Sequence, residues 1–360
     1  MANFRDGRSW SLARRRALAR LLIVLPALFG LPACATDYNR QAEVRTFVAK
    51  MVRERGFTAE EVRATIAAAN FQQAIVDTMS RPAERTLSWK DYRKIFLTPA
   101  RVEQGVAFWD ANTAALARAQ ATYGVPPEIV VAIIGVETSY GRNVGNYRVL
   151  DALVTLAFDY PPRGPFFRGE LEQYLLLARE QHLEPTALVG SYAGAMGLAQ
   201  FIPSSYRSFA VDFDSDGAKD LWRNPTDAIG SVGNYFRAHE WRTGQAVVMQ
   251  LPAPGPALDA VAGNDPEPKQ RFSDLVGKAF TGGAISADEA VALFRFDGDN
   301  GVEYWLGLHN FYVITRYNHS PMYALAVYQL AQAVNAARTD GARAGQTPAV
   351  AGPSVTGQAP

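Results

Sequence analysis

The sequence predicts a mainly α-helical protein of the α+β class, in which one short segment contributes strands. Apolar residues recur with helical spacing before residue 125 and again after residue 302. Between these regions, residues 244–301 are rich in proline and contain a strand-like run from Val247 to Leu251. We therefore expect a large helical part with a small inserted part that contains β structure.

Residues 1–33 have the pattern of a secretory signal peptide. Basic residues 14–16 and Arg20 precede an apolar run from Leu21 to Leu31, and small residues follow. That run is too short for a membrane-spanning helix, which needs about 20 residues. Cys34 is the only cysteine, so the chain cannot form an internal disulfide. The position of Cys34 at the end of the signal also argues against a catalytic thiol or a thiolate metal site.

The residues around Cys34 resemble a bacterial lipobox, in which cleavage exposes a cysteine that is then acylated. Pro32 departs from the usual pattern, so ordinary cleavage after Ala33 or Ala35 remains the alternative. Two or more acyl chains anchor a protein stably, at ~0.8 kcal/mol per buried CH₂. By resemblance to sorted lipoproteins, the absence of Asp after Cys34 indicates the outer membrane. We expect a lipid-anchored protein on its periplasmic face, with a soluble periplasmic protein as the alternative.

Residues 34–125 are expected to form an N-terminal helical domain. Five apolar residues fall on one helix face, at i, i+3, i+4, i+7 and i+8: Val44, Phe47, Val48, Met51 and Val52. Thr58 and Glu61 have the spacing of a capping box. A further helical segment is expected from about Pro99 to Tyr123.

The next helix opens at residues 124–128 and continues with apolar residues from Ile129 to Val136. Apolar residues cover every face, so this helix is expected to be buried on all sides. Glu137 follows, and Gly141 fits the cap that ends the helix. A carboxyl group there loses hydration, which favours its protonated form and suits a general acid. The alternative is an ion pair in which Arg142 or another arginine holds Glu137.

Three segments in this order carry a family resemblance. Residues 135–141 read Gly-Val-Glu-Thr-Ser-Tyr-Gly, residues 194–201 read Gly-Ala-Met-Gly-Leu-Ala-Gln-Phe, and residues 310–318 read Asn-Phe-Tyr-Val-Ile-Thr-Arg-Tyr-Asn. Alone, the second segment could be a tight glycine-rich turn that leads into a helix. Together, the three resemble the membrane-bound lytic murein transglycosylase B family, over roughly residues 40–335.

This resemblance implies a core similar to goose-type lysozyme and cleavage of the β-1,4 bond between N-acetylmuramic acid and N-acetylglucosamine in peptidoglycan. Glu137 would protonate the leaving oxygen and then take the proton of the muramyl C6 hydroxyl, which leaves a 1,6-anhydro end. We see no second lone acid in an apolar context near these motifs, as a one-carboxylate scheme requires. The alternatives are a muramidase that hydrolyses the same bond and a non-catalytic peptidoglycan-binding lipoprotein.

Six further residues match the family's substrate groove by position: Ser191, Gln200, Tyr235, Tyr317, Asn318 and Tyr323. Tyrosine suits sugar binding, because its ring packs on a pyranose face while its hydroxyl forms hydrogen bonds. The alternative for each tyrosine is plain core packing.

An aspartate-rich loop resembles the first half of an EF-hand. Oxygen ligands at positions 1, 3, 5 and 7 would come from Asp212, Asp214, Asp216 and the Ala218 carbonyl. Position 12 holds Arg223 in place of a glutamate, which excludes the standard loop. The family resemblance implies a longer loop completed by Asp227. We expect a structural Ca²⁺ and no organic cofactor, with a solvated acidic turn as the alternative.

The remaining boundaries follow from these motifs. We expect the catalytic core over residues 126–240, an α/β insertion over 241–301, the C-terminal part of the core as helix over 302–337 and a disordered tail over 338–360. The net charge of +1 gives no electrostatic footprint for nucleic acid. The expected partners are peptidoglycan glycan strands, the membrane through the lipid anchor, and cell-wall synthesis machinery.

Overall fold

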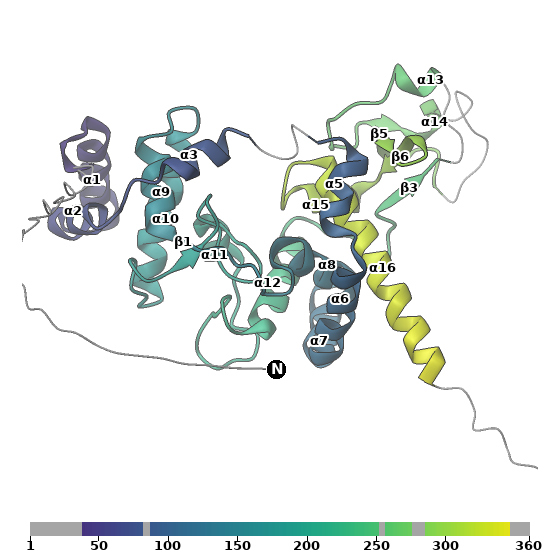
Figure 1. The fold of residues 1–360 in the computed structure, drawn as a ribbon, viewed down its shortest axis with the longest axis horizontal. Helices are drawn as coiled ribbons and strands as arrows, with labels where there is room; N and C mark the ends of the chain where they lie inside the picture. Colours follow the sequence, from purple (N-terminus) through teal and green to yellow (C-terminus); the bar gives the residue numbers. More distant parts are fainter. Residues whose placement is uncertain (1–37, 82–86, 252–255, 276–284, 346–360) are drawn as a thin grey trace, which may run out of the picture. The chain divides into compact units, whose positions relative to one another are not determined.

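The computed structural model describes residues 38–81, 87–251, 256–275 and 285–345 (Figure 1). The expected signal peptide, Cys34 and the last fifteen positions (346–360) lie outside this range. The described chain is mainly helical with small antiparallel sheets, as the sequence predicts. Its first residues form a short 3₁₀ helix, η1 (Tyr38–Arg40).

The first helices pack against one pair of later helices. They are α1 (Ala42–Arg55), α2 (Ala59–Ala67) and α3 (Gln73–Met79). Helix α1 contacts α10 (Gly164–Glu180), and α3 contacts α9 (Val149–Phe158). The capping box between Thr58 and Glu61 is confirmed. One expectation is wrong: Val52 is 41% exposed, because it falls at the edge of the apolar face whose other four members are buried.

The second group of helices packs elsewhere, although the sequence analysis assigns it to the same N-terminal domain. It comprises α5 (Trp89–Phe96), α6 (Pro99–Ala111) and α7 (Thr113–Tyr123). The expected single segment from Pro99 to Tyr123 is two helices, because Asn112 leaves the helical conformation and its side chain donates to the Phe108 carbonyl. Helix α6 contacts α8 (Pro127–Thr138) and α16 (Pro321–Gly345), and α7 contacts α12 (Pro225–Ala238).

Helix α8 is the apolar helix of the core, and all residues from Ile129 to Val136 are buried as expected. Its cap differs from the expectation. Ser139 and Tyr140 already adopt left-handed backbone with φ of 51° and 60°, so the helix ends before Gly141. Among the described residues no single helix is long and apolar enough to cross a membrane. Helices α7 and α8 reach that threshold only as a pair bent by 114°.

The inserted segment forms a four-stranded antiparallel sheet in the order β3-β6-β5-β4. Its strands are β3 (Val248–Gln250), β4 (Gln270–Arg271), β5 (Ala290–Gly298) and β6 (Gly301–Gly307). Helices α13 (Pro256–Asp259) and α14 (Phe272–Leu275) contribute to its small separate core. The expectation of helix from residue 302 is wrong, because β6 pairs with β5 along its whole length and continues to Gly307.

The C-terminal helices return to the main core. They are α15 (His309–Thr315) and α16, which packs against α8. The last helix is expected to end at residue 337, but α16 continues to Gly345. An ion pair between Arg338 and Asp110 on α6, 2.8 Å long, ties this extension to the core. Two short strands, β1 (Tyr147–Arg148) and β2 (Val189–Gly190), and helix α11 (Pro203–Phe209) complete the described elements.

A buried carboxylate joins α1 to α10. Glu172 has a side chain only 3% exposed, and it accepts hydrogen bonds from Lys50 at 2.5 Å and Arg55 at 2.6 Å. Burial by itself would raise the pKa of Glu172, but the bonds from the two cations prevail and lower it. The charged form is therefore the one that stabilises the contact between the two helices.

We predict that Glu172→Gln lowers the free energy of unfolding by ~2 kcal/mol at pH 7, because hydrogen bonds to charged groups are lost. The folded-state pKa lies below the unfolded value of ~4.3, so this stabilisation is present above that pH and is lost as the pH falls through the folded pKa. Urea unfolding at pH 7 and at about pH 3.5 measures both effects.

Glu54→Gln is the control, since Glu54 forms an exposed pair with Arg53 and should change stability by less than ~0.5 kcal/mol. A Glu172→Gln effect that stayed constant across the pH range would contradict the assignment to the ionised carboxylate.

Candidate active site

Glu137 lies at the end of α8, where the buried helix reaches the surface. Its side chain is half-buried, less enclosed than the sequence analysis expects. The Tyr323 hydroxyl of α16 donates to Glu137 Oε1 at 2.5 Å. Burial and the charge of Glu137 raise the pKa of Tyr323 well above its usual value, so this hydroxyl stays protonated. Arg142, the expected alternative partner, lies exposed.

The last turn of α8 is fixed from three sides. The Thr138 hydroxyl bonds to the Leu198 carbonyl at 3.2 Å, which links α8 to the second glycine-containing motif. Arg101 of α6 donates to the Gly135 carbonyl. A Cβ at Gly135 would lie 2.5 Å from the Tyr140 hydroxyl oxygen, so only glycine leaves room for that ring. Together these contacts hold Glu137 beside Tyr323.

The loop from Gly190 to Phe201 is tightly folded on its own backbone. The Ser191 hydroxyl accepts bonds from the N–H groups of Ala193 and Ala195 at 3.2 and 3.1 Å. Gln200 has left-handed backbone, and its side-chain amide donates to the carbonyls of Val144 and Gly197. The structure thus places Ser191 and Gln200 as ordered parts of one loop, joined to α8 through Leu198.

The two remaining tyrosines differ in their surroundings. Tyr317 is half-buried and donates to the Ala199 carbonyl at 2.6 Å, and burial and Glu137 raise its pKa well above the usual value. Tyr235 is only 6% exposed, donates to the Arg316 carbonyl at 2.5 Å, and stacks on His239. Its ring lies 4.8 Å from that of Tyr317, centre to centre. Tyr235 therefore supports Tyr317 from within the core.

A cavity of about 980 Å³ reaches this cluster at Asn318, whereas Glu137 and the other expected groove residues are not among the residues that line it. Asn318 lines it, together with Pro321 and Met322, which immediately precede Tyr323. Several lining residues were not identified from the sequence: Trp89, Tyr160, Arg163, Tyr192, Asn264, Arg295, Asp297 and His319. Tyr192 and His319 lie beside motif residues in the sequence, and this could have identified them as lining residues. Nothing in the sequence connects the residues of β5 with this cavity. Burial and the nearby Arg316 and Arg163 lower the pKa of His319, which favours its neutral form.

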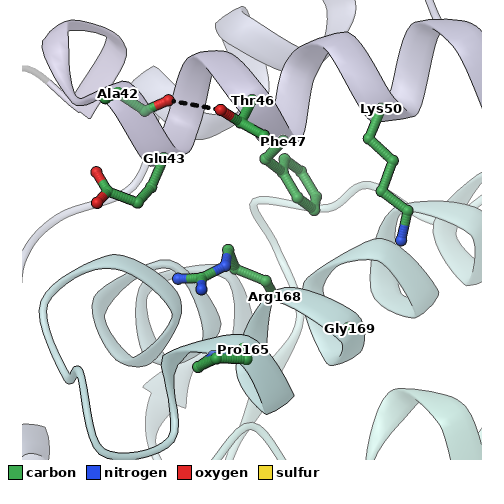
Figure 2. A pocket seen from close by; sticks show the side chains of 8 residues that line it. All are labelled: Ala42, Glu43, Thr46, Phe47, Lys50, Pro165, Arg168 and Gly169. Atoms are coloured by element: carbon green, nitrogen blue, oxygen red, sulfur yellow. Dashed lines mark hydrogen bonds between the residues drawn. The ribbon is translucent and has the colours of Figure 1, made fainter.

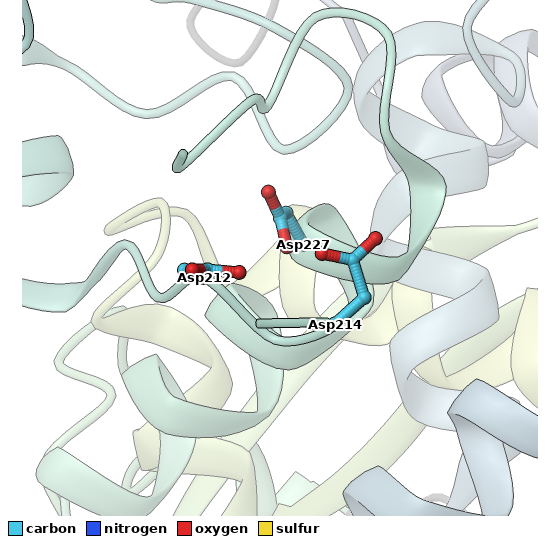
Figure 3. A group of neighbouring side chains, drawn as sticks. All are labelled: Asp212, Asp214 and Asp227. Atoms are coloured by element: carbon cyan, nitrogen blue, oxygen red, sulfur yellow. The ribbon is translucent and has the colours of Figure 1, made fainter. Parts of the chain in front are cut away.

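Three of the expected metal ligands lie together (Figure 3). Carboxylate oxygens of Asp212, Asp214 and Asp227 all lie within 4.8 Å of one another. Asp227 is fully buried, and it accepts bonds from the N–H groups of Phe213 at 2.7 Å and Asp220 at 2.8 Å. Burial raises the pKa of Asp227. Three acidic groups this close repel each other in their charged form, so the cluster fits a cation.

The Asp216 carboxylate does not join this group of three. Asp216 is exposed, and one of its carboxylate oxygens accepts the Ala218 N–H at 2.9 Å. Gly217 between them has a φ of 96°, which is the glycine conformation that an EF-hand loop needs at its sixth position. The loop therefore has the turn that the sequence predicts, with Asp216 turned back onto its own backbone.

Glu170 of α10 is another buried acid, alongside Glu172 and Asp227; it is 6% exposed, and burial raises its pKa. Its carboxylate accepts bonds from the backbone N–H and the hydroxyl of Ser204, at 2.9 and 2.8 Å. Glu170 thus caps the start of α11 and has a structural role that its sequence neighbours did not indicate.

Comparison with known proteins identifies a family and several relatives. Residues 39–332 match the family model described as Transglycosylase SLT domain. Membrane-bound lytic murein transglycosylase B of Escherichia coli (strain K12) is 44% identical over 312 residues, which cover 84% of this chain and 85% of that protein. The catenated lytic transglycosylase SltB1 from Pseudomonas aeruginosa has a TM-score of 0.80 and 52% identity, with 84% of this chain and 100% of that chain covered.

Two further solved structures contain bound groups. The Escherichia coli lytic transglycosylase Slt35 in complex with calcium has a TM-score of 0.77 and 45% identity, and the match covers 84% of this chain and 96% of that one. SltB3 from Pseudomonas aeruginosa, in complex with NAG-NAM-pentapeptide, has a TM-score of 0.70 and 29% identity, with 83% and 80% covered.

We predict that Gly135→Ala lowers the free energy of unfolding by about 1–3 kcal/mol, because the new Cβ displaces Tyr140. Gly169→Ala is the matched control. A Cβ at this glycine of α10 meets nothing within 4 Å, so the change should stabilise the helix by ~0.5–1 kcal/mol. Denaturant unfolding of both variants makes the comparison. Equal effects of the two substitutions would rule out a close contact at Gly135.

Proposed function

The chain belongs to the lytic murein transglycosylase family, and from that premise we propose how its own residues cleave peptidoglycan. It is an enzyme of this class that acts on peptidoglycan, since the family model matches residues 39–332 and a transglycosylase B is 44% identical over 84% of the chain. We assign it the β-1,4 bond between N-acetylmuramic acid and N-acetylglucosamine, and a 1,6-anhydromuramyl product.

Glu137 is the catalytic acid and base in this proposal. It gives its proton to the glycosidic oxygen as the C1–O4 bond breaks, so N-acetylglucosamine leaves with a free hydroxyl. The muramyl C6 hydroxyl then forms a bond to C1 and returns its proton to the carboxylate, and no water is consumed. Intramolecular attack gains roughly 7–11 kcal/mol from proximity where the geometry is good. The observation that carries this role is the hydrogen bond between Tyr323 and Glu137, together with a cavity of about 980 Å³ whose lining includes Met322, the residue before Tyr323.

Tyr323 orients the acid in this scheme. As a protonated donor on one carboxyl oxygen, it fixes the rotation of the Glu137 side chain. Four further residues are proposed to contact the sugars or to shape the loop from Gly190 to Phe201 that contacts them: Ser191, Gln200, Tyr317 and Asn318. Tyr235 packs against Tyr317 and is not proposed to contact the sugars, because its hydroxyl donates to the Arg316 carbonyl.

The aspartate cluster is proposed to hold a structural Ca²⁺. A related structure was determined with calcium, and the three close carboxylates here are oxygen ligands of the kind that this ion prefers. Asp216 and the Ala218 carbonyl complete the set once the loop closes around the ion. The cation supports the loop between α11 and α12 and takes no part in the reaction.

The cellular setting of the enzyme is inferred from its relatives and its N-terminus. The Escherichia coli relative carries the name membrane-bound. We propose that this chain is anchored through acylated Cys34 at the periplasmic face of the outer membrane. Glycan strands are its substrate, and cell-wall synthesis machinery is a proposed partner.

We predict that Glu137→Gln keeps the fold and glycan binding and loses about a hundredfold or more in turnover, because general acid–base catalysis is removed. Mass spectrometry of muropeptides released from purified sacculi measures both amount and chemistry. Wild type should release anhydro ends, which lack one water relative to reducing ends. Products with reducing ends would identify a muramidase instead.

Tyr323→Phe serves as a graded comparison, since it removes only the hydroxyl and should cost roughly tenfold in kcat. Release of anhydro products by Glu137→Gln at the wild-type rate would remove Glu137 from the mechanism.

For the metal, we predict that Ca²⁺ at about 100 times its Kd adds ~2.7 kcal/mol to the free energy of unfolding, and that Asp227→Asn loses this gain. Thermal unfolding with Ca²⁺ and with chelator, for both proteins, is the measurement. Glu240→Gln, an exposed acid beyond the end of α12, is the control. An equal Ca²⁺ response in wild type and Asp227→Asn would disprove the site.

A further inference from the structure

A second cavity lies away from Glu137, between α1 and α10 (Figure 2). Its volume is about 420 Å³. Its lining comes from both helices: Ala42, Glu43, Thr46, Phe47, Lys50, Pro165, Arg168 and Gly169. We call it the α1–α10 groove. The ring of Phe47 points into it from α1, and Pro165 lies opposite on α10.

The groove is held open by contacts at its ends. Lys50 is engaged by the buried Glu172, as described above, and Tyr38 donates to Asp159 at 2.8 Å near the start of α1. On the α10 wall, Arg168 Nη1 donates to the Ala157 carbonyl at 2.8 Å, which fixes the guanidinium in place. The helices therefore do not need a ligand to keep their spacing.

Three charged side chains line this space; Lys50 is paired with Glu172, and the other two carry opposite charges that do not pair with each other. Figure 2 shows the Glu43 carboxylate on one wall and the Arg168 guanidinium on the other. Among the residues that the structure describes, neither takes part in an ion pair. An anion alone would meet repulsion from Glu43, and a cation alone would meet repulsion from Arg168. A ligand that carries both charges on one short aliphatic chain satisfies both walls and packs its methylene groups on Pro165, which is exposed.

We propose that the α1–α10 groove binds the zwitterionic amino-acid end of a peptidoglycan stem peptide, with its carboxylate on Arg168 and its ammonium on Glu43. This inference rests on the proposed function, because it names a second contact with the same substrate. A stem peptide bound in the groove keeps the enzyme on the peptidoglycan while the glycan strand occupies the site at Glu137. The groove recognises the stem and takes no part in cleavage.

The test is calorimetric titration of the Ca²⁺-loaded wild-type protein with the free tripeptide L-alanyl-γ-D-glutamyl-meso-diaminopimelate, which has no glycosidic bond to cleave. Glu43→Gln should weaken binding at least tenfold, and Arg168→Gln likewise. Gly169→Leu should abolish it, because a side chain at this open helical position fills the groove without strain. Glu60→Gln, an exposed acid on α2, should bind as wild type does.

Arg168→Gln also loses its bond to Ala157, so Glu43→Gln, which breaks no hydrogen bond, is the decisive variant. Absence of binding to wild type would overturn the proposal. Unchanged affinity in Glu43→Gln or Gly169→Leu would also overturn it. The same holds for equal affinity for a tripeptide in which the diaminopimelate carboxylate next to the free ammonium is amidated. Because the titration needs no turnover, its outcome is separate from the anhydro-product test of Glu137.

Discussion

The hydrogen bond between Tyr323 and Glu137 is the contact on which the site depends. The two residues are 186 positions apart in sequence. They meet because the helices that carry them, α8 and α16, pack against each other. The donor is a phenol that burial keeps protonated, so the carboxyl group is oriented by a neutral partner.

A chain of backbone contacts extends this constraint to the aspartate loop. Thr138 bonds to the Leu198 carbonyl, and the Leu198 N–H donates to the Leu221 carbonyl at 2.7 Å. Leu221 follows Asp220, whose N–H donates to the buried Asp227. A cation at the aspartates would therefore stiffen the same loop that carries Ser191 and Gln200, for which we propose contacts with the sugars. This connection explains how an ion outside the reaction could matter to the geometry around Glu137.

Much of this arrangement could be predicted from the sequence, because its signals are local. The buried α8, the capping box at Thr58, the mainly helical fold and the turn at Gly217 follow from spacing and residue type. The sheet boundary at Gly307 and the break at Asn112 were missed, since strand pairing and side-chain caps depend on partners distant in sequence or on geometry. The same holds for the cavity wall from β5 and for the buried Glu170, whose partner lies 34 residues away.

The central claim is that the end of α8 presents the Glu137 carboxyl group to the scissile bond, with Tyr323 fixing its orientation. The most direct measurement is the crystal structure of Ca²⁺-loaded Glu137→Gln with a bound tetrasaccharide of alternating N-acetylglucosamine and N-acetylmuramic acid. The account predicts a muramyl glycosidic oxygen within about 3.2 Å of the amide at position 137, with the Tyr323 hydroxyl still bonded to that side chain. A glycan bound elsewhere, or an amide separated from every glycosidic oxygen by more than one water, would contradict it.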